Sequence, residues 1–531
     1  MSRDLPLPAS DLTEWRPNAN PWIIAAAVML ATFLEVLDTS VANVALPHIA
    51  GSLSASNDEA TWVLTSYLVS NAIVLPMTGW LSMFFGRKRF LIGCIFLFTL
   101  ASAACGMAAG LGFLIAARVL QGAAGGALQP LSQAILMESF PPAKRGMAMA
   151  VFGLGVVVAP IIGPVLGGWI TDNYSWRWVF YINVPVGGLA VLMSQAFLED
   201  PPYLRAARER SRGRIDYIGF GAMALWLATL QVILDRGQQD DWFGAAWIRW
   251  ASPISLASML FFIVWELRRE HPLVNLRVLK KRNFALGTML ITIVGIVLYS
   301  TIALLPLFLQ SLMGYPALNS GMALSPRGFG AIVALVIVGR LVGKVDTRLL
   351  ITVGFGILAY SSYQLGNINL EIATKNVTWP NILSGLGTGF LFVPLTTAAM
   401  SGLPQAEMGN AAGIFNLMRN LGGSIGISMA TTLVARGSQS HQALMVTHLT
   451  PYDPAFRQSV EAASSALARW GDPVAAQLQA HRVLYGILVR QANLWAYVDT
   501  FRFLAVMALL CIPVVLLFKR VRHRGGPAAA H

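Results

Sequence analysis

The sequence has 531 residues, of which 56% are hydrophobic and only 12% are charged. Soluble proteins carry about 25% charged residues, so this chain has too few to cover a soluble surface, and lipid is its expected solvent. The formal net charge of +13 does not indicate nucleic-acid binding, because the Lys and Arg residues cluster at alternate connections between apolar runs.

Apolar runs recur from Trp22 to Phe518 and predict an all-α polytopic membrane protein with fourteen spans. A run of about 20 residues suffices to cross about 30 Å of hydrocarbon. In chain order the spans are expected near Trp22–Leu46, Ala60–Trp80, Phe90–Ala109, Phe113–Met137, Met147–Ile170, Val179–Phe197, Ile215–Leu234, Trp247–Leu267, Phe284–Gln310, Ser320–Val338, Leu349–Leu370, Thr378–Met400, Asn410–Ala435 and Tyr497–Phe518. An even number of spans puts both termini on one side, and the basic tail from Lys519 makes that side the cytoplasm.

Two pairs of similar segments indicate an internal repeat. Gly146–Leu154 opens the fifth span and resembles Gly409–Leu417, which opens the thirteenth, while Gly79–Arg89 more weakly resembles Gly339–Arg348. Such repeats are typical of transporters with two parallel six-helix halves. The expected division is a cytoplasmic segment (1–21), a six-helix bundle (22–198), a linker with two inserted spans (199–283), a second six-helix bundle (284–518) and a cytoplasmic tail (519–531).

Residues 436–496 of the second bundle are expected to lie outside the membrane, in the periplasm. Helical spacing of apolar residues predicts helices at Pro454–Trp470 and Pro473–Asn493. Two interpretations remain open: the helices lie flat on the outer membrane surface, or they form a docking surface for a periplasmic partner.

Glu35 and Asp38 are acidic residues deep inside the first predicted span. At 1.5 Å per residue, Glu35 lies about 20 Å inward from Trp22 and Asp38 about 24 Å. An ionisable group at such depth costs about 2.5–3.5 kcal/mol, so a functional reason is expected. Their spacing places both carboxyls on one helix face, where they resist ionising together, and such a pair can exchange a proton. A static ion pair or a helix-packing hydrogen bond is the structural alternative.

Basic residues within the spans are the natural partners of these carboxyls. Arg118 lies at a depth similar to that of Asp38, and Gln121 shares its helix face, so an Asp38–Arg118 pair is expected. Arg327 is expected to extend along its span to the outer surface. Arg419 lies well inside its span, where it binds either an anionic substrate or a helix carbonyl.

Small residues and prolines mark two spans for close helix packing. Gly122 and Gly126 form one pair with four-residue spacing, and Ala159, Gly163 and Gly167 form a second series, in a span that also carries Pro160 and Pro164. Taken alone, these patterns are ordinary in membrane proteins.

Several motifs together resemble one transporter family. The first span carries Leu37-Asp-Thr-Ser-Val-Ala-Asn-Val-Ala-Leu-Pro47, the fourth Arg118-Val-Leu-Gln-Gly122, the fifth Ala159-Pro-Ile-Ile-Gly-Pro-Val-Leu-Gly-Gly168, and the thirteenth Arg419-Asn-Leu-Gly-Gly-Ser-Ile-Gly426. From about residue 20 to 520 the chain resembles the fourteen-span drug:proton antiporters of the major facilitator superfamily, and most closely the EmrB-type exporters.

The resemblance implies alternating access between two six-helix bundles, with Asp38, Glu35 and Arg118 in proton coupling. The candidates for lining the substrate cavity are Asn43, Gln121, Gln129, Asn416 and Arg419. The residues expected to serve the conformational change are Gly79, Gly86, Arg87, Lys88, Gly122, Gly126, Pro160, Gly163, Pro164, Gly167 and Gly168. One departure is Met83, which stands where many members have an aspartate, so no charge relay is expected through that position.

The expected function is export of drugs, toxic organics or fatty-acid-like compounds across the bacterial inner membrane, driven by the proton motive force and without a bound cofactor or metal. The resemblance also implies a periplasmic adaptor and an outer-membrane channel as partners. The alternative is a proton symporter that imports a nutrient on the same fold. An enzyme is not expected, because the seven histidines are scattered over loops and tails.

Overall fold

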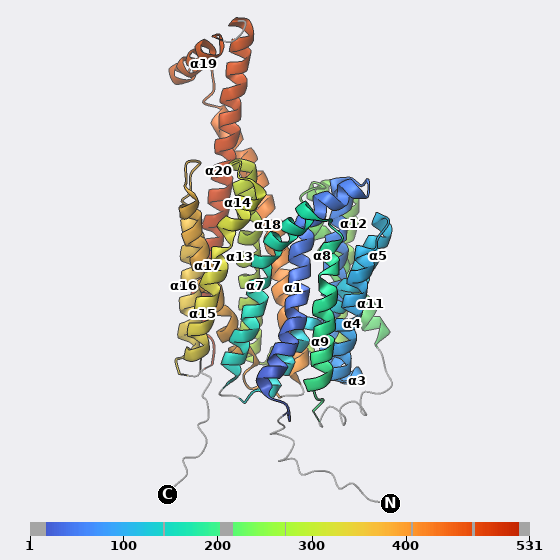
Figure 1. Cartoon of the computed structure of the whole chain (residues 1–531). Coiled ribbons are helices and arrows are strands. Elements are labelled where there is room, and N and C mark those ends of the chain that lie inside the picture. The colour runs from blue at the N-terminus through green and yellow to red at the C-terminus, as the bar shows by residue number, and fades with distance from the viewer. Residues whose placement is uncertain are drawn as a thin grey trace, which may run out of the picture.

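The computed structural model describes residues 17–141, 144–201, 216–270, 272–342, 344–404, 407–469 and 473–519. These residues form helices throughout, and no strand is present among them, which confirms the all-α fold class. The helices stand side by side in two groups, and a pair of helices rises from one end (Figure 1). Of the predicted cytoplasmic segments 1–21 and 519–531, residues 1–16 and 520–531 lie outside the described residues, and the location of both segments stays a prediction.

The N-terminal half consists of six spans, three of which are built from more than one helix. The second span combines α2, a 3₁₀ turn and α3, the fourth combines α5 and α6, and the sixth combines α8 and α9. The helices are α1 (Pro21–Ser52), α2 (Asn57–Val74), α3 (Thr78–Phe85), α4 (Arg87–Gly106), α5 (Leu111–Gly125), α6 (Leu128–Ser139), α7 (Arg145–Asn173), α8 (Trp178–Tyr181) and α9 (Asn183–Phe197).

An inserted pair of helices and the C-terminal half follow. The insert is α11 (Tyr217–Arg236) and α12 (Ala246–Arg268). The C-terminal half contains α13 (Arg282–Leu307), α14 (Ala317–Leu324), α15 (Pro326–Leu341), α16 (Thr347–Leu365), α17 (Thr374–Met400), α18 (Met408–Val446), α19 (Pro454–Leu467) and α20 (Pro473–Val515).

Side chains at the helix starts satisfy backbone N–H groups that have no partner within the helix. Ser56 Oγ accepts from the backbone N–H of Glu59 at 3.1 Å, while Glu59 Oε2 accepts from the backbone N–H of Ser56 at 2.8 Å, so α2 begins with a capping box. Helices α11 and α16 begin with simpler caps, in which the side chains of Asp216 and Asp346 each accept a hydrogen bond from a backbone N–H of the first turn.

Twelve of the described helical segments are long and apolar enough to cross a membrane. Helices α16 and α18, which correspond to the eleventh and thirteenth predicted spans, are missing from this set although both pack within the C-terminal half. Helix α18 is the more polar because it carries Asn410, Asn416 and Arg419 inside the bundle. The count of fourteen spans therefore stays a prediction.

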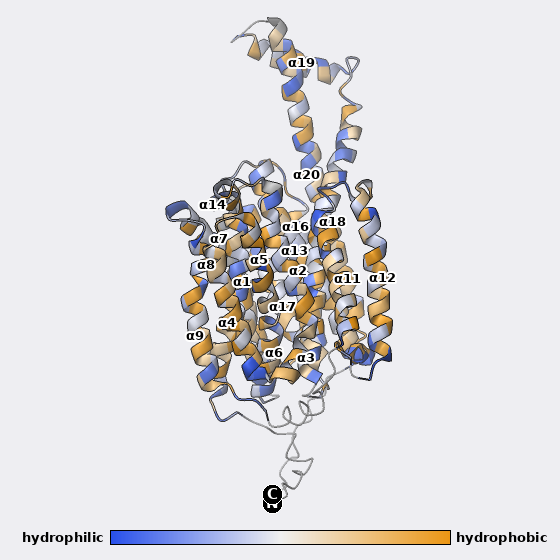
Figure 2. Ribbon diagram, turned by 90° about the vertical axis from the view of Figure 1, so that its right-hand side faces the viewer, coloured by the Kyte–Doolittle hydropathy of each residue, from blue (hydrophilic) through white to orange (hydrophobic). Residues whose placement is uncertain are grey.

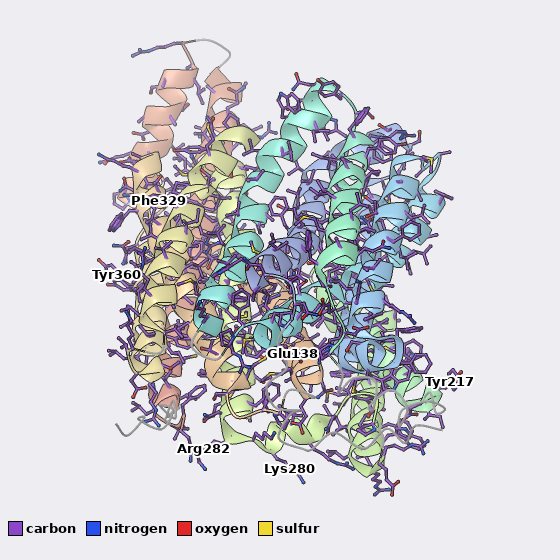
Figure 3. The ribbon with its side chains drawn as sticks, turned by 60° about the horizontal axis from the view of Figure 1, so that its bottom comes forward. Glu138, Tyr217, Lys280, Arg282, Phe329 and Tyr360 are labelled. Atoms are coloured by element: carbon purple, nitrogen blue, oxygen red, sulfur yellow. The ribbon has the colours of Figure 1, made fainter. Side chains whose placement is uncertain are left out.

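The two ends of the bundle differ in charge. The connections α3–α4, α6–α7, α12–α13 and α15–α16, which carry the Lys and Arg clusters, all lie at what we call the basic end. Figure 3 shows Lys280 and Arg282 there. The opposite end, from which α18 and α20 extend, is called the far end.

At the far end the structure does not agree with one of the two interpretations, that two helices lie flat on the membrane. Helix α18 continues to Val446, and α20 is one helix of 43 residues, so the predicted external helix and the last predicted span are continuous. Both helices extend away from the bundle, α19 lies across their tip, and polar residues become frequent where they leave it (Figure 2). Ser438 bonds Asn493 at 2.5 Å, which joins the two helices in this extension, called the far-end hairpin.

The insert packs against both halves through α11. Asp235 accepts a hydrogen bond from Thr65 of α2. On the other side, Gln231 Oε1 accepts from Ser424 Oγ of α18 at 3.0 Å. In the connection to α12, Trp242 Nε1 donates to Thr432 Oγ1 of α18 at 3.1 Å. The insert thus lies over the boundary between α2 and α18.

Candidate functional site

Asp38 of α1 lies at the centre of a buried polar cluster within the N-terminal half. Its Oδ2 accepts from Arg118 Nη1 of α5 at 2.6 Å. Its Oδ1 accepts from Gln121 Nε2 at 2.8 Å and from Asn183 Nδ2 of α9 at 2.7 Å. The side chains of Asp38 and Arg118 are both 0% exposed. The structure therefore brings together the expected pair and the expected Gln121.

Arg118 is held from several directions. Its Nε donates to the carbonyl of Val63 at 3.0 Å and its Nη1 also donates to Gln121 Oε1 at 2.9 Å. The Tyr67 ring lies with its centroid 4.2 Å from the guanidinium carbon, a cation–π contact. With this many partners, the Asp38–Arg118 pair is a fixed element of the N-terminal half.

Glu35 has a different environment, which crosses from one half to the other. Its Oε1 accepts from Asn71 Nδ2 of α2 at 3.2 Å, and its Oε2 accepts from Gln129 Nε2 of α6 at 2.6 Å. The Oε1 of the same Gln129 side chain accepts from Arg419 Nη2 of α18, which belongs to the C-terminal half. We call this series of hydrogen-bonded side chains, Glu35–Gln129–Arg419, the Glu35 relay.

A second bond between the halves lies close to the relay along both helices. Asn416 Nδ2 of α18 donates to Gln133 Oε1 of α6 at 2.7 Å. Asn416 and Gln133 are each one helical turn from Arg419 and Gln129, respectively. Among the described residues Arg419 bonds an amide of the opposite half and not a helix carbonyl, while its role in binding an anionic substrate stays a prediction.

Glycines bring helices of the N-terminal half close together around the cluster. A Cβ on Gly122 would lie 2.3 Å from the carbonyl oxygen of Tyr67, and one on Gly126 would lie 2.5 Å from that of Asn71. The backbone of α5 and of Gly126, which follows it, therefore packs directly against α2. Similarly, Gly163 and Gly167 let α7 approach Ser40 and Val41 of α1. The remaining small-residue candidates lie on the same face or next to it: Pro160, whose carbonyl accepts from Ser40 Oγ at 3.4 Å, Pro164 and Gly168.

At the basic end the two halves touch through the repeated segments. A Cβ on Gly79 of α3 would lie 2.6 Å from the backbone N and Cα of Asn410 at the start of α18. A Cβ on Gly146, at the start of α7, would lie 2.6 Å from Val342 at the end of α15. Segment Gly79–Arg89 therefore contacts Gly409–Leu417, and segment Gly146–Leu154 contacts Gly339–Arg348. The repeat relates these two contacts between the halves to each other.

The α3–α4 connection is anchored within the N-terminal half. Gly86 has φ 87°, a conformation that favours glycine, and lies next to Asp200. Asp200 Oδ1 accepts from the backbone N–H of Lys88 at 2.8 Å. Arg87 forms a buried ion pair with Glu138 of α6. Figure 3 labels Glu138 near the basic end. The expected residues Gly86, Arg87 and Lys88 thus fix one connection at the basic end.

Two predicted residues lie outside the cluster and the relay. Asn43 is exposed and has no hydrogen bond to either among the described residues, so its place in the substrate cavity stays a prediction. Arg327 does not extend to the outer surface: it is 8% exposed and bonds Ser384. Sequence reasoning also missed two buried polar residues: Asn183, inside the sixth predicted span, and Glu138, directly after the fourth. For Asn183 its occurrence in an apolar run was the available signal.

A comparison with known families gives one match over most of the chain, because the model of the Major Facilitator Superfamily covers residues 28–427. The chain belongs to this superfamily. It is therefore a transporter and not an enzyme, as expected, and a multi-pass protein of the bacterial inner membrane.

Curated relatives confirm the expected EmrB-type resemblance. The chain is 39% identical to "Multidrug export protein EmrB" of Escherichia coli (strain K12) over 433 residues, which is 81% of this chain and 84% of that protein. It is 35% identical to "Fatty acid resistance protein FarB" of Neisseria gonorrhoeae over 505 residues, or 95% of this chain and 97% of that protein.

Solved structures share the fold at low sequence identity. The proton:xylose symporter XylE bound to 6-bromo-6-deoxy-D-glucose has a TM-score of 0.60 and 14% identity, with 94% of this chain and 99% of that chain covered. The human organic anion transporter MFSD10 has a TM-score of 0.59 and 13% identity, with 93% and 99% covered. At such identity the likeness concerns the fold alone.

Proposed function

We propose that this transporter exports hydrophobic and amphipathic compounds in exchange for protons, from the basic end to the far end. The names of the relatives, which include a multidrug export protein, a fatty acid resistance protein and a "Colistin resistance protein EmrB" of Acinetobacter baumannii, support export. The positive-inside rule supports a cytoplasmic basic end, a periplasmic far end and fourteen spans. The observation that carries the proposal is the different environment of the two carboxyls in α1.

The two carboxyls have separate roles in this mechanism. Asp38 and all its partners belong to the N-terminal half, so its protonation can change without relative movement of the halves. Glu35 is connected to Arg419 across the boundary. A proton on Glu35 removes the charge that Gln129 and Arg419 stabilise, which weakens the relay and allows α18 to separate from α6. Glu35 then couples proton binding to the conformational change, and Asp38 maintains the cluster through which the proton passes.

The proton motive force supplies enough energy for export without a bound cofactor. One charge crossing 100 mV provides about 2.3 kcal/mol, which supports an about 50-fold concentration ratio of a neutral substrate. Exchange for a proton is therefore sufficient for useful export at ordinary membrane potentials.

The proposal is tested in acidified inside-out vesicles that contain the purified protein. Substrate addition should release protons from the lumen with the wild type, but not with Asp38→Asn or Glu35→Gln. Asp499→Asn is the matched control, since Asp499 is a helical carboxyl bonded to His441 at the far end, outside the cluster and the relay. Retained pH-dependent export by Asp38→Asn contradicts the proposal. No proton release with any compound, from folded protein, favours the nutrient symporter instead.

We further propose that the far-end hairpin binds a periplasmic adaptor. Together with an outer-membrane channel, the transporter and the adaptor would then form a tripartite pump. The hairpin presents exposed apolar side chains of α18 and α20 to the periplasm, among them Leu444, Leu478 and Ile487. Deletion of residues 454–470 should abolish crosslinking to the adaptor and leave substrate binding by the purified transporter unchanged. Intact crosslinking after this deletion refutes the docking site.

A further inference from the structure

Arg327 is a buried charge that belongs to neither the Asp38 cluster nor the Glu35 relay. It lies in the first turn of α15 and is 8% exposed. Phe329, two residues further along, is 66% exposed and points outward from the C-terminal half (Figure 3). Two residues correspond to about 200° around a helix, so Arg327 points away from the lipid, toward the helices behind α15.

The guanidinium of Arg327 is only partly satisfied by α17. Its Nη2 and Nε both donate to Ser384 Oγ, at 2.5 and 3.2 Å. Its Nη1 is buried and has no hydrogen-bond partner among the described residues. One turn toward the far end, Asn381 Nδ2 of α17 donates to the carbonyl of Ala323 at 3.2 Å, and the buried Ser320 Oγ has no partner within the described chain. Unused hydrogen-bonding groups thus gather along the contact of α14 and α15 with α17.

No carboxylate of the described residues pairs with this charge. The sequences of α13 to α18 contain no aspartate or glutamate. None of the ion pairs formed by the described residues includes Arg327. An arginine side chain stays protonated, so it cannot adapt to burial by losing its charge. Buried charges are normally paired, and a single serine hydroxyl does not supply the missing anion.

Toward the basic end from Arg327, α15 and α17 carry buried apolar side chains that border the opposite half. Leu335 of α15 and Phe392 of α17 lie eight residues from Arg327 and Ser384, about 12 Å along their helices toward the basic end. Both side chains approach Gly153 of α7, at 3.1 and 3.3 Å from a Cβ placed there. A cationic position therefore adjoins an apolar contact between the halves, which suits a molecule with an anionic head and an apolar tail.

We propose that Arg327 and Ser384 bind the carboxylate of an anionic amphipathic substrate, with the apolar tail directed along Leu335 and Phe392. The free Nη1 and the bonded Nη2 form the planar fork that matches two carboxylate oxygens. This inference rests on the proposed export function and assigns a binding position to one class of its substrates, the long-chain carboxylates.

The test is a binding comparison in nanodiscs of phosphatidylcholine, with dodecanoate and its neutral amide as probes. The wild type should bind dodecanoate at least tenfold more tightly than dodecanamide. Arg327→Gln should remove this preference, and Arg327→Lys should keep part of it because the charge remains. Arg502→Gln is the matched control, since Arg502 is a far-end arginine of the same half that bonds Gly366 and Asn367. It should bind both probes as the wild type does.

Four results would overturn the inference. The first is equal binding of both probes to the wild type, and the second is an unchanged preference in Arg327→Gln. The third is loss of the wild-type preference when gluconate in the buffer is replaced by chloride, which would assign the position to an inorganic anion. The fourth is loss of the preference on addition of phosphatidylglycerol, which would assign the position to a lipid head group.

Failure of the export function can be distinguished from failure of the carboxylate site. Proton-driven transport of tetraphenylphosphonium, a hydrophobic cation, should be retained by Arg327→Gln. If the wild type transports no compound but still binds dodecanoate through Arg327, the site stands and the export function is wrong. If the cation is exported and dodecanoate binding does not depend on Arg327, the export function stands and the site is wrong.

Discussion

The close approach of α3 to α18 at Gly79 leads to a quantitative prediction for the substitution Gly79→Ala. The added Cβ would lie 2.6 Å from backbone atoms of Asn410, whereas ordinary van der Waals contact is 3.4–4 Å. Because main-chain atoms of a helix cannot rotate away, α3 and α18 must separate by at least 0.8 Å, the difference between 3.4 and 2.6 Å.

Such overpacking costs about 1–3 kcal/mol in the state described here, in which the basic end is closed. A state in which α3 and α18 are apart carries no such cost. The equilibrium should therefore shift about 5- to 150-fold toward the state with an open basic end. Export should slow, because the return to the closed state becomes unfavourable.

The assay uses Ser82→Cys as a reporter in a background without the native cysteines, all of which are buried. Ser82 is 1% exposed and donates to the carbonyl of Gly79 at 2.8 Å, so its reactivity reports on the contact between α3 and α18. In inside-out vesicles, Gly79→Ala should raise the rate of labelling by a membrane-impermeant maleimide within the predicted range. Gly93→Ala is the control, since a Cβ there meets nothing within 4 Å. An unchanged rate in folded Gly79→Ala would refute the reasoning.

Three further substitutions test the Asp38 cluster and its packing. Arg118→Ala leaves Asp38 as an unpaired buried charge and should reduce stability by about 3–5 kcal/mol, seen as a lower melting temperature in detergent; an unchanged melting temperature contradicts a buried ion pair. Asn183→Ala removes one charge-assisted hydrogen bond and should lower the free energy of unfolding by about 1.5–3 kcal/mol in the same assay. An unchanged free energy of unfolding would contradict this bond. Gly122→Ala should destabilise through its clash with α2, whereas Gly112→Ala, which meets nothing within 4 Å, should not; equal effects of the two would argue against close packing.

The sequence was sufficient to predict the helical class, the position of most spans and the Asp38–Arg118 contact. Charges are rare in apolar runs, so similar depth along two helices leaves few possible partners. Depth alone does not determine which helices are neighbours. For that reason the sequence did not predict that Glu35 connects to Arg419 through Gln129, since the bond depends on how the two halves face each other.

The other differences between prediction and structure also have physical causes. Helix α20 extends beyond the predicted span because an exposed helix needs no apolar run, and no proline or glycine interrupts Leu488 to Tyr497. Arg327 was expected at the surface because it is close to a span end. Arg327 instead lies on the face of α15 that packs on α17, which hydropathy alone does not reveal.

The position of the insert gives the molecule two unlike sides in the plane of the bilayer. Since α11 bonds Thr65 of α2 and Ser424 of α18, protein covers the boundary between the halves on that side. On the other side α7 packs directly on α15. A compound dissolved in the lipid therefore meets the insert on one side of the boundary between the halves and a direct helix contact on the other. The surroundings of the two halves thus lack the symmetry of the repeat that relates them.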